Sequence, residues 1–408
     1  MQIDLNGKTI LLGVTGSISA YKACDIARLF VKAGADVHII MTSSAERFVS
    51  ALTFEALTRN KVLTDSTESW SSELNHIDIG KKCDIFVIAP ATANTINKLK
   101  CGIADNILTQ TALAYTREII IAPAANTNML LNHATHDSMD HLRSKGYTFV
   151  EPQEKLLACG DTGSGALAEP VEVFYAAAKA LLKEVFWEGR EVLVTGGGSR
   201  EKIDEVRYIS NFSSGKMASA LSLALYLKGA NVTYISTMGF NDLPMQIKRV
   251  NANCAEDILK ATQESIATVT AQTTEPVPYL FMVAAVADFK PANTKEGKVK
   301  KSSVGTHWNI ELEQTTDILS TIDKSKIKAV GFKAEMDSQE GLNNAIALLE
   351  NKGVDAVCYN LLDDAKSFGG SDNEITFITK DTQVALGRTD KLTLAKKIID
   401  LSKGLIDG

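Results

Sequence analysis

Cys159 stands in LLACGDTGSGALAEP, residues 156–170, a run with three glycines and few bulky side chains. Such a run cannot build a core, yet it carries a thiol, the carboxylate of Asp161 and the hydroxyl of Thr162. An unperturbed cysteine thiol has a pKa of about 8.5, so it is mostly protonated at pH 7 and can serve as a general acid. The residues alone allow an inert cysteine in a surface loop or a thiol that a glycine-rich flap delivers to a site.

Two other side chains of the first half can transfer protons or bind a carboxylate. His76 in ELNHIDIG can act as a base, because histidine has a reference pKa of about 6.5. Asn126 in APAANTNM can donate to a carboxylate without adding charge. The structural alternatives are a polar histidine at a strand end and an N-cap for a helix after residue 128.

The segment GVTGSISAYKA (13–23) joins an apolar run to a helical pattern through small and hydroxyl residues. Backbone N–H groups at a helix start, with the hydroxyls of Ser17 and Ser19, suit a single phosphate. The segment is not G-x-G-x-x-G, which disfavours a dinucleotide. A tight strand–helix turn is the structural alternative.

Two later segments repeat this arrangement. MTSSAERF (41–48) places Thr42 or Ser43 where either can cap a helix or hold a ligand. APATANTINKLKCGIADN (89–106) follows an apolar run with Thr92, Asn94 and Thr95. One N-cap would explain one of these polar residues, whereas the set of three suggests hydrogen-bonding groups around a planar heterocycle.

The second half has two comparable segments. In VTGGGSREKIDEVRYISNFSSGKMASALSLAL (194–225), the run Ser213, Ser214, Gly215 and Lys216 resembles a phosphate cradle at a helix start. It lacks the first glycine of the G-x-x-x-x-G-K-[ST] pattern, so a generic phosphate-binding turn is the alternative.

AAVADFKPANTKEGKVKKSS (284–303) concentrates positive charge in an acidic chain, through Lys290, Lys295, Lys298, Lys300 and Lys301. Such a run is usually a solvated loop. Its place after a buried strand, beside Asp288, suggests a mobile lid over a triphosphate and metal.

Composition limits the class of protein. A length of 408 residues predicts two domains, and 45% hydrophobic with 23% charged residues is typical of a globular protein. A net charge of -6 and a pI near 5.7 argue against nucleic-acid or membrane-surface binding. We expect no membrane span and no signal peptide. The six cysteines form no C-x-x-C pair, which favours a reducing cytoplasm.

The elements that must position these residues alternate between strand and helix. Short apolar runs predict parallel strands at 9–14, 36–41, 84–89 and 118–123, with helices over 20–34 and 92–102. This alternation predicts a doubly wound α/β sheet with ligands at the carboxyl ends of its strands.

The pattern then restarts. We predict a helix followed by a polar link over 179–190 and a domain boundary near residue 188, giving domains 1–188 and 189–408. The second domain is predicted to have strands at the start of 191–200 and at 231–236, 279–286, 328–332 and 355–360. Segments 374–381 and 382–388 predict a terminal hairpin.

Over roughly residues 5–180 the chain resembles the flavin-dependent cysteine decarboxylases, specifically the phosphopantothenoylcysteine decarboxylase domain of coenzyme A biosynthesis. The motifs that carry the resemblance are GSISAYK, APATANT, NHID, APAANTNM and ACGDTGSGALAEP. The resemblance implies a flavodoxin-like domain with catalytic residues His76, Asn126 and Cys159. It implies FMN-binding positions at Gly16, Ser17, Ser19, Thr42, Ser43, Pro90, Thr92, Ala93 and Asn94.

In the implied reaction the thiol side of the substrate is oxidised by FMN to a thioaldehyde. Decarboxylation then gives an ene-thiolate, which is protonated and re-reduced, with Cys159 as the general acid. The sequence departs from the family at one place. The family usually has Pro-Ala-Met-Asn, whereas this chain has Ala125 before Asn126. The departure concerns packing on the flavin side rather than the chemistry.

Over roughly residues 189–402 the chain resembles phosphopantothenate–cysteine ligase. The motifs are TGGGSREKIDEVRYISNFSSGKM, AAVADF with its K-V-K-K run, and VGFKAE (330–335). The resemblance implies a Rossmann-like domain in which the phosphopantothenate carboxylate attacks the α-phosphate of CTP and releases pyrophosphate. The amine of cysteine then displaces CMP from the acyl-cytidylate.

This second resemblance also implies residue roles. Asn211 and Lys298 are the implied catalytic residues. The implied CTP-binding positions are Ser213, Ser214, Gly215, Lys216, Asp288, Lys298, Phe332 and Lys352. Mg2+ or Mn2+ is expected on the triphosphate, with Asp288 as its ligand. The family commonly has a second lysine one helical turn before Lys352, where this chain has Leu348.

The tandem order implies one bifunctional enzyme, because the ligase product is the decarboxylase substrate. Its implied small-molecule partners are 4'-phosphopantothenate, cysteine and CTP. The resemblance also implies decarboxylase trimers and ligase dimers, together a homo-dodecamer.

Three alternatives remain at this point. The first is another flavin decarboxylase or a relative that makes prenylated flavin. Absence of the ACGD flap would favour this alternative. The second is an NAD-dependent reductase using 191–240, but NVTYIST lacks the acidic residue that such a fold needs. The third is a non-enzymatic flavin-binding subunit, which could lose His76 or Cys159 without cost.

Overall fold

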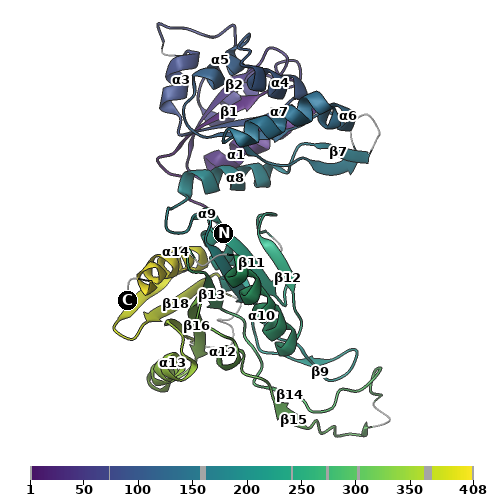
Figure 1. Ribbon diagram of the computed structural model, residues 1–408, viewed down its shortest axis with the longest axis vertical. Helices are drawn as coiled ribbons and strands as arrows, with labels where there is room; N and C mark the ends of the chain where they lie inside the picture. Colours follow the sequence, from purple (N-terminus) through teal and green to yellow (C-terminus); the bar gives the residue numbers. More distant parts are fainter. Residues whose placement is uncertain are drawn as a thin grey trace. The chain divides into compact units, whose positions relative to one another are not determined.

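The structure is a computed structural model that describes residues 2–72, 74–156, 162–239, 242–272, 275–300, 304–362 and 370–406 (Figure 1). The chain folds into two compact units, an N-terminal unit, Gln2–Leu182, and a C-terminal unit, Lys183–Gly408. The predicted boundary near residue 188 lies close to this division. Within the described ranges, no helix combines the length and the apolar character needed to cross a membrane.

The N-terminal unit is built on a five-stranded sheet in the order β2-β1-β3-β4-β5. All neighbouring strands in it are parallel. The strands are β1 (Thr9–Val14), β2 (Asp36–Met41), β3 (Ile85–Ala91), β4 (Ile119–Pro123) and β5 (Thr148–Phe149). Every residue of β3 is buried, as expected for a parallel sheet covered on both faces. The order is flavodoxin-like, and its direction reverses between β1 and β3, where ligands bind in such sheets.

Helices cover this sheet, and α1 packs against α8 through the rings of Phe30 and Phe174, with centroids 5.4 Å apart. They are η1 (Ile18–Tyr21), α1 (Lys22–Lys32), α2 (Ala51–Thr58), α3 (His76–Lys82), α4 (Ala93–Cys101), α5 (Ile107–Ala114), α6 (Thr127–Leu131), α7 (His133–Ser144) and α8 (Pro170–Leu182). A separate antiparallel hairpin consists of β6 (Gln153–Leu156) and β7 (Thr162–Ala166).

The C-terminal unit contains an eight-stranded sheet in the order β12-β11-β8-β13-β16-β17-β18-β19. Its strands are β8 (Glu191–Gly196), β11 (Asn231–Ser236), β12 (Lys248–Asn251), β13 (Tyr279–Met282), β16 (Lys328–Glu335), β17 (Ala356–Leu361), β18 (Asp372–Ile378) and β19 (Gln383–Asp390). Strands β12 to β17 in this order are parallel, and β18 and β19 add an antiparallel hairpin. The parallel part has a Rossmann-like order that reverses between β8 and β13.

The remaining elements of this unit cover the sheet or extend from it. The helices are α9 (Lys216–Leu227), α10 (Ala255–Gln272), α12 (Ile318–Thr321), α13 (Ser338–Lys352), α14 (Lys391–Ser402) and η3 (Lys403–Leu405). Two short antiparallel pairs are β9 (Glu201–Lys202) with β10 (Tyr208–Ile209), and β14 (Phe289–Pro291) with β15 (Leu312–Gln314). Figure 1 shows β14 and β15 on an arm that extends from the main sheet.

The predicted fold class, the terminal hairpin and all strands of both central sheets except β5 and β12 are confirmed. A helix followed by a polar link was predicted over 179–190, and this helix is the end of α8, but the link is not purely polar. Helix α8 begins at Pro170, a residue preorganised for a first helical position, and ends at Leu182. The following residues supply aromatic side chains to the C-terminal unit. Trp187 is fully buried against Tyr279, and the Arg190 guanidinium lies 4.2 Å above the Phe186 ring.

The strand predicted over 279–286 is also too long, because β13 ends at Met282. The reason is Thr195, a buried residue of β8. Its hydroxyl oxygen accepts from the backbone N–H groups of Val283 (3.1 Å) and Ala284 (3.2 Å) and so turns the chain away from the sheet. The residues 283–288 therefore form a loop at the carboxyl end of β13.

Gly196, at the end of β8, allows α9 and β11 to approach the same strand closely. A Cβ atom there would lie 2.6 Å from the Ala218 Cβ and 2.6 Å from the Tyr234 hydroxyl. We expect Gly196→Ala to lower the free energy of unfolding of the C-terminal unit by about 1–3 kcal/mol, because neither neighbour can retreat without moving its element. Calorimetry of the full chain measures the change. The matched control is Gly404→Ala, whose Cβ would have no neighbour within 4 Å. Equal melting temperatures for the two variants would contradict this account of the packing.

Candidate functional site

In the N-terminal unit, the loops that follow β1, β2 and β3 are bound to one another. The Thr15 hydroxyl donates to the Pro90 carbonyl (2.7 Å), and its oxygen accepts from the Thr92 N–H (3.0 Å). A Cβ on Gly16 would lie 2.5 Å from the Ser44 Cβ, so the turn after β1 contacts the loop after β2 only because this residue is glycine. The three loops therefore form one edge at the carboxyl ends of the strands.

Several predicted ligand-binding hydroxyls at this edge are caps. Ser17 accepts from the Ser19 N–H (3.2 Å), Thr42 accepts from the Ala45 N–H (3.3 Å), and Thr92 caps α4, which begins at Ala93. Capping occupies a hydroxyl as an acceptor and leaves it able to donate. Of the predicted set, Ser43 and Asn94 are exposed, Ser19 is half-buried, and Pro90 and Ala93 are buried. This edge can hold a phosphate through N–H and hydroxyl groups.

His76 lies at the start of α3, not at a strand end as the structural alternative supposed. Asn75 caps this helix, accepting from the N–H groups of Ile77 (3.0 Å) and Asp78 (2.9 Å). Because α3 leads into the amino end of β3, it runs antiparallel to the strands and begins at their carboxyl edge. His76 is therefore at the same edge as the capped loops.

Glu68 is a polar partner of His76 that the sequence did not reveal. The His76 Nδ1 lies 2.6 Å from the Glu68 Oε1, and this hydrogen bond holds the pKa of Glu68 below its usual value. Trp70 presents its indole edge-on to the imidazole, with ring centroids 5.6 Å apart. Glu68 and His76 are eight residues apart and meet through a loop, so their contact leaves no periodic pattern. The sequence therefore carries no signal for this contact.

Asn126 caps α6, which begins at Thr127, so the N-cap interpretation is confirmed. Its Oδ1 accepts from the Asn128 N–H (2.9 Å), and any contact with a substrate carboxylate must therefore come from its Nδ2. The segment is joined to the end of β3, because the Ala124 N–H donates to the Ala91 carbonyl (2.9 Å). Ala125 packs against the hydrophobic core.

The glycine-rich run that opened the sequence analysis is partly a hairpin, β6–β7. Cys159 and Asp161 lie outside the described residues. The strand that follows them docks beside Asn126: the Ala125 N–H donates to the Gly165 carbonyl (3.2 Å). A Cβ on Gly163 would lie 2.2 Å from the Thr127 hydroxyl, so this approach also requires glycine.

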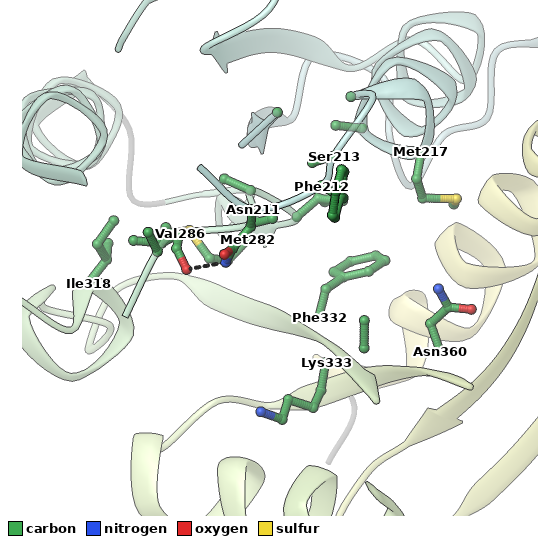
Figure 2. Close-up of a pocket in the computed structure, with 18 of the residues that line it drawn as sticks. Asn211, Phe212, Ser213, Met217, Met282, Val286, Ile318, Phe332, Lys333 and Asn360 are labelled. Atoms are coloured by element: carbon green, nitrogen blue, oxygen red, sulfur yellow. Dashed lines mark hydrogen bonds between the residues drawn. The ribbon is translucent and has the colours of Figure 1, made fainter. Parts of the chain in front are cut away.

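In the C-terminal unit, a cavity of about 740 Å³ lies at the carboxyl ends of β8, β13 and β16 (Figure 2). Asn211 is fixed at its wall, because its Nδ2 donates to the Val286 carbonyl (3.0 Å). Gly215, with φ of 68°, caps α9 at the cavity. The structure brings these predicted residues together in its lining: Asn211, Ser213, Ser214, Gly215, Lys216, Asp288, Phe332 and Lys352.

Asn360 and Lys391 also line this cavity and were missed by the sequence reasoning. Figure 2 shows Phe332 and Asn360 projecting from β16 and β17 beneath Asn211 and Ser213. Asn360 had a signal, since it ends the predicted strand 355–360. Lys391 had none. It is buried, it donates to the Gly370 carbonyl, and burial together with nearby Lys216 lowers the pKa of Lys391.

Lys352 meets the cavity as part of an ion pair. Its ammonium donates to the Asp317 carboxylate and to the Ser320 hydroxyl (3.0 Å). Partial burial acts to raise the pKa of Asp317, but the hydrogen bond from Lys352 holds this pKa below its usual value. Leu348, where the family commonly has a lysine, lines the cavity and packs toward Gly331, whose added Cβ would lie 3.0 Å from the leucine Cδ2.

Lys298 is exposed and is not among the residues that line the cavity. The chain on both sides of it is tethered to another loop. The Val299 N–H donates to the Asp204 Oδ2 (3.1 Å), the Arg207 guanidinium donates to the Val299 carbonyl (2.8 Å), and the Glu205 N–H donates to the Gly297 carbonyl (3.3 Å). Asp204 is fully buried, and hydrogen bonds led by Arg207 hold its pKa far below the usual range. Lys301, the last lysine of the predicted lid, lies outside the described residues.

Asp288 lines the cavity as the predicted metal ligand. Within the described ranges, no three or more histidine, cysteine or acidic side chains are grouped as a metal site. A cation at Asp288 would therefore need most of its ligands from a bound molecule.

Comparison with known families assigns each unit. Residues 2–181 match the family model described as Flavoprotein, and residues 187–405 match the DNA/pantothenate metabolism flavoprotein C-terminal domain. Among solved structures, a PPC decarboxylase mutant complexed with pantothenoylaminoethenethiol is 33% identical and covers 42% of this chain and 96% of its own, with a TM-score of 0.39. The C-terminal domain of a coenzyme A biosynthesis bifunctional protein CoaBC is 28% identical to this chain. It covers 55% of this chain and 99% of its own length, with a TM-score of 0.44.

Relatives align with nearly the whole chain. The coenzyme A biosynthesis bifunctional protein CoaBC of Bacillus subtilis (strain 168) is 39% identical over 384 residues, which is 92% of each chain. The protein of the same name from Haemophilus influenzae is 34% identical over 403 residues, which is 98% of each chain. Both units, in the same order, are thus shared with these proteins, and the chain belongs to the CoaBC family of bifunctional coenzyme A biosynthesis enzymes.

Proposed function

We propose that the C-terminal unit joins cysteine to 4'-phosphopantothenate at the expense of CTP, and that the N-terminal unit decarboxylates the product with FMN. One observation carries this proposal. In each unit, loops that carry side chains selected by the family resemblance lie at the carboxyl edge of a parallel sheet, beside the point where the strand order reverses, and ligands bind at this edge in such sheets. Lys298 lies outside the cavity lining, and Cys159 lies outside the described residues.

The edge of the N-terminal unit fits FMN. Its phosphate would be held by the turn of Gly16, Ser17 and Ser19, where glycine permits the close approach and the hydroxyls can donate. The planar ring would lie along the loops that carry Thr42, Ser43 and the segment 90–94. When bound, FMN supplies the oxidation and re-reduction that loss of CO2 from a cysteinyl carboxylate requires.

The chain's own residues then bind substrate and move protons. His76 acts as the base, because Nδ1 is bonded to Glu68 and Nε2 is the nitrogen left to take a proton. Asn126 donates from Nδ2 to the substrate carboxylate without adding a charge that would hold CO2 in place. Cys159 returns a proton to the ene-thiolate, and the hairpin that carries it docks beside Asn126.

The cavity of the C-terminal unit is proposed to bind CTP and 4'-phosphopantothenate together. Ser213, Ser214 and Gly215 at the start of α9 supply donors for phosphate, and Lys216 supplies charge. Phe332 offers a ring face, and Asn360 a side-chain amide, for the nucleotide. Asp288 would hold Mg2+ or Mn2+, which would supply positive charge beside the triphosphate. We propose CTP as the preferred nucleotide, although Leu348 stands where the family commonly has a lysine.

Asn211 and Lys298 are proposed to act on the reacting groups of the ligase. Asn211, fixed by Val286, orients the acyl-cytidylate. Lys298 stabilises charge on the α-phosphate while pyrophosphate leaves. Because its ammonium lies outside the cavity lining, this role requires a closing movement of the tethered segment or a second copy of the chain.

We also propose a homo-oligomer of decarboxylase trimers and ligase dimers, a dodecamer in the cytoplasm. Large apolar side chains are exposed on both units, including Leu52 (70%) and Leu131 (65%) on the first and Phe212 (75%) on the second. Apolar surface of this kind is commonly covered by a partner. The cysteines of the described ranges are unpaired, which fits a reducing compartment.

Lys298→Gln tests whether the two units catalyse separate reactions. Pyrophosphate release from CTP, phosphopantothenate and cysteine should fall about 100- to 1000-fold, because the charge on the α-phosphate loses a donor. Decarboxylation of supplied phosphopantothenoylcysteine should be unchanged. Lys248→Gln, the same change at an exposed position of β12, is the control. Loss of both activities in Lys298→Gln would show that the two sites are not separate.

Cys159→Ser tests the proposed acid. A serine hydroxyl is a much weaker acid than a thiol, so the variant should release CO2 but stall before 4'-phosphopantetheine. Quantifying CO2 and the reduced product in the same reaction measures this split. If the variant forms 4'-phosphopantetheine at the normal rate, the proton comes from another group.

A further inference from the structure

Glu68 and His76 form a close pair at the edge of the N-terminal unit. The Nδ1–Oε1 distance is 2.6 Å, and the same carboxylate oxygen accepts from the His76 backbone N–H at 3.3 Å. Each side chain is about a quarter exposed, at 24% for Glu68 and 23% for His76. A carboxylate that accepts two hydrogen bonds from one residue fixes both the position and the direction of that residue's ring.

The loop that carries Glu68 is itself held in place. The Glu68 N–H donates to the carbonyl of buried Thr64 (3.2 Å), and the Thr67 hydroxyl donates to the Val62 carbonyl (2.8 Å). Ser69 and Leu74 exchange backbone hydrogen bonds of 2.8 and 3.1 Å. This exchange closes the loop and returns the chain to His76. Glu68 is therefore presented by a built turn rather than by a freely moving side chain.

Among residues 2–72 and 74–156, the other charges near the imidazole are engaged elsewhere. Helix α3 packs against α5 and β1, and neither of these elements contains an ionisable residue. In the loop, Asp65 accepts from the Ile107 N–H (2.9 Å). On α3, Asp78 accepts from the Asn75 side chain (2.7 Å) and lies 3.6 Å from the Lys81 ammonium. Among the described residues, Glu68 is the carboxylate paired with the ring.

The geometry points to Glu68 as a positioning residue for His76, one that holds the imidazole in the tautomer with its proton on Nδ1. An ionised carboxylate can only accept, so Nδ1 must be the donor and Nε2 must carry the lone pair. Nε2 is then the atom that takes a proton from the substrate, and Glu68 stabilises the resulting cation without itself taking the proton. This inference rests on the proposed role of His76 in decarboxylation.

The tautomer is directly measurable and needs no catalysis. The full-length enzyme is labelled with 15N-histidine, and the His76 signal is identified among six histidines by its loss in His76→Gln. The imidazole 15N shifts of the neutral ring report which nitrogen holds the proton. We expect the Nδ1–H form in the wild type and a larger share of the Nε2–H form in Glu68→Gln, whose amide can donate to Nδ1. A wild-type His76 that is mostly Nε2–H overturns the inference, whether or not the enzyme decarboxylates.

Kinetics then separate positioning from general support of the fold. With FMN bound and phosphopantothenoylcysteine as substrate, Glu68→Gln should lower kcat by at least about 10-fold, because the imidazole loses the carboxylate that holds its tautomer, and leave KM unchanged. Glu151→Gln, the same change at an exposed residue paired with Arg143, is the matched control. A Glu68→Gln enzyme with wild-type kcat, or one that loses only substrate affinity, contradicts the inference. Absence of decarboxylation by the wild type would instead refute the proposed function.

Discussion

In each sheet, a buried threonine forms hydrogen bonds across the point where the strand order reverses. The candidate sites depend on these hydrogen bonds. In the N-terminal unit, Thr15 follows β1 and bonds to Pro90 and Thr92 at the end of β3. In the C-terminal unit, Thr195 on β8 accepts from Val283 and Ala284 after β13. Two neighbouring parallel strands end their ladder at these points, and the threonine satisfies the backbone groups released there. The chain can then turn away from the sheet and leave a ligand edge.

The two edges place different chemistry on the same framework. Capping hydroxyls, glycine and an amide line the first, with the Glu68–His76 pair beside them. The second combines a helix start with lysines, including the buried Lys391. An edge lined mostly by uncharged hydrogen-bonding groups suits a flavin and a carboxylate that must depart as CO2. A positively charged cavity suits a triphosphate and the anionic groups formed when it is cleaved.

Close backbone approaches complete both sites. Gly16, Gly163 and Gly196 each stand where a Cβ would come within about 2.6 Å of another atom. These glycines belong to the turn after β1, the hairpin beside Asn126 and the end of β8. In each case the missing side chain permits contact between segments far apart in sequence.

Hydrophobic runs predicted all strands of both central sheets except β5 and β12, because a strand buried on two faces must be apolar throughout. Strand β5 has only two residues and β12 is mostly exposed, so neither has such a run. The start of α9 was also predicted from a local pattern, in which glycine followed by lysine resembles a phosphate cradle at a helix start. Local patterns failed where tertiary contacts decide the outcome. Buried Trp187 and half-buried Phe186 pack against Tyr279 rather than continuing α8, and Thr195 ends β13 early. Glu68 and Lys391 join their sites through loop contacts, which no periodicity encodes.

In the proposed function, ligation at one edge must precede decarboxylation at the other. The most direct measurement supplies the full-length enzyme with 4'-phosphopantothenate, CTP and cysteine labelled with 13C in its carboxyl group. Pyrophosphate and 13CO2 are followed together. We expect one 13CO2 for each pyrophosphate, with pyrophosphate appearing first and no 13CO2 when CTP is omitted. Release of 13CO2 from cysteine without CTP would contradict the proposed order.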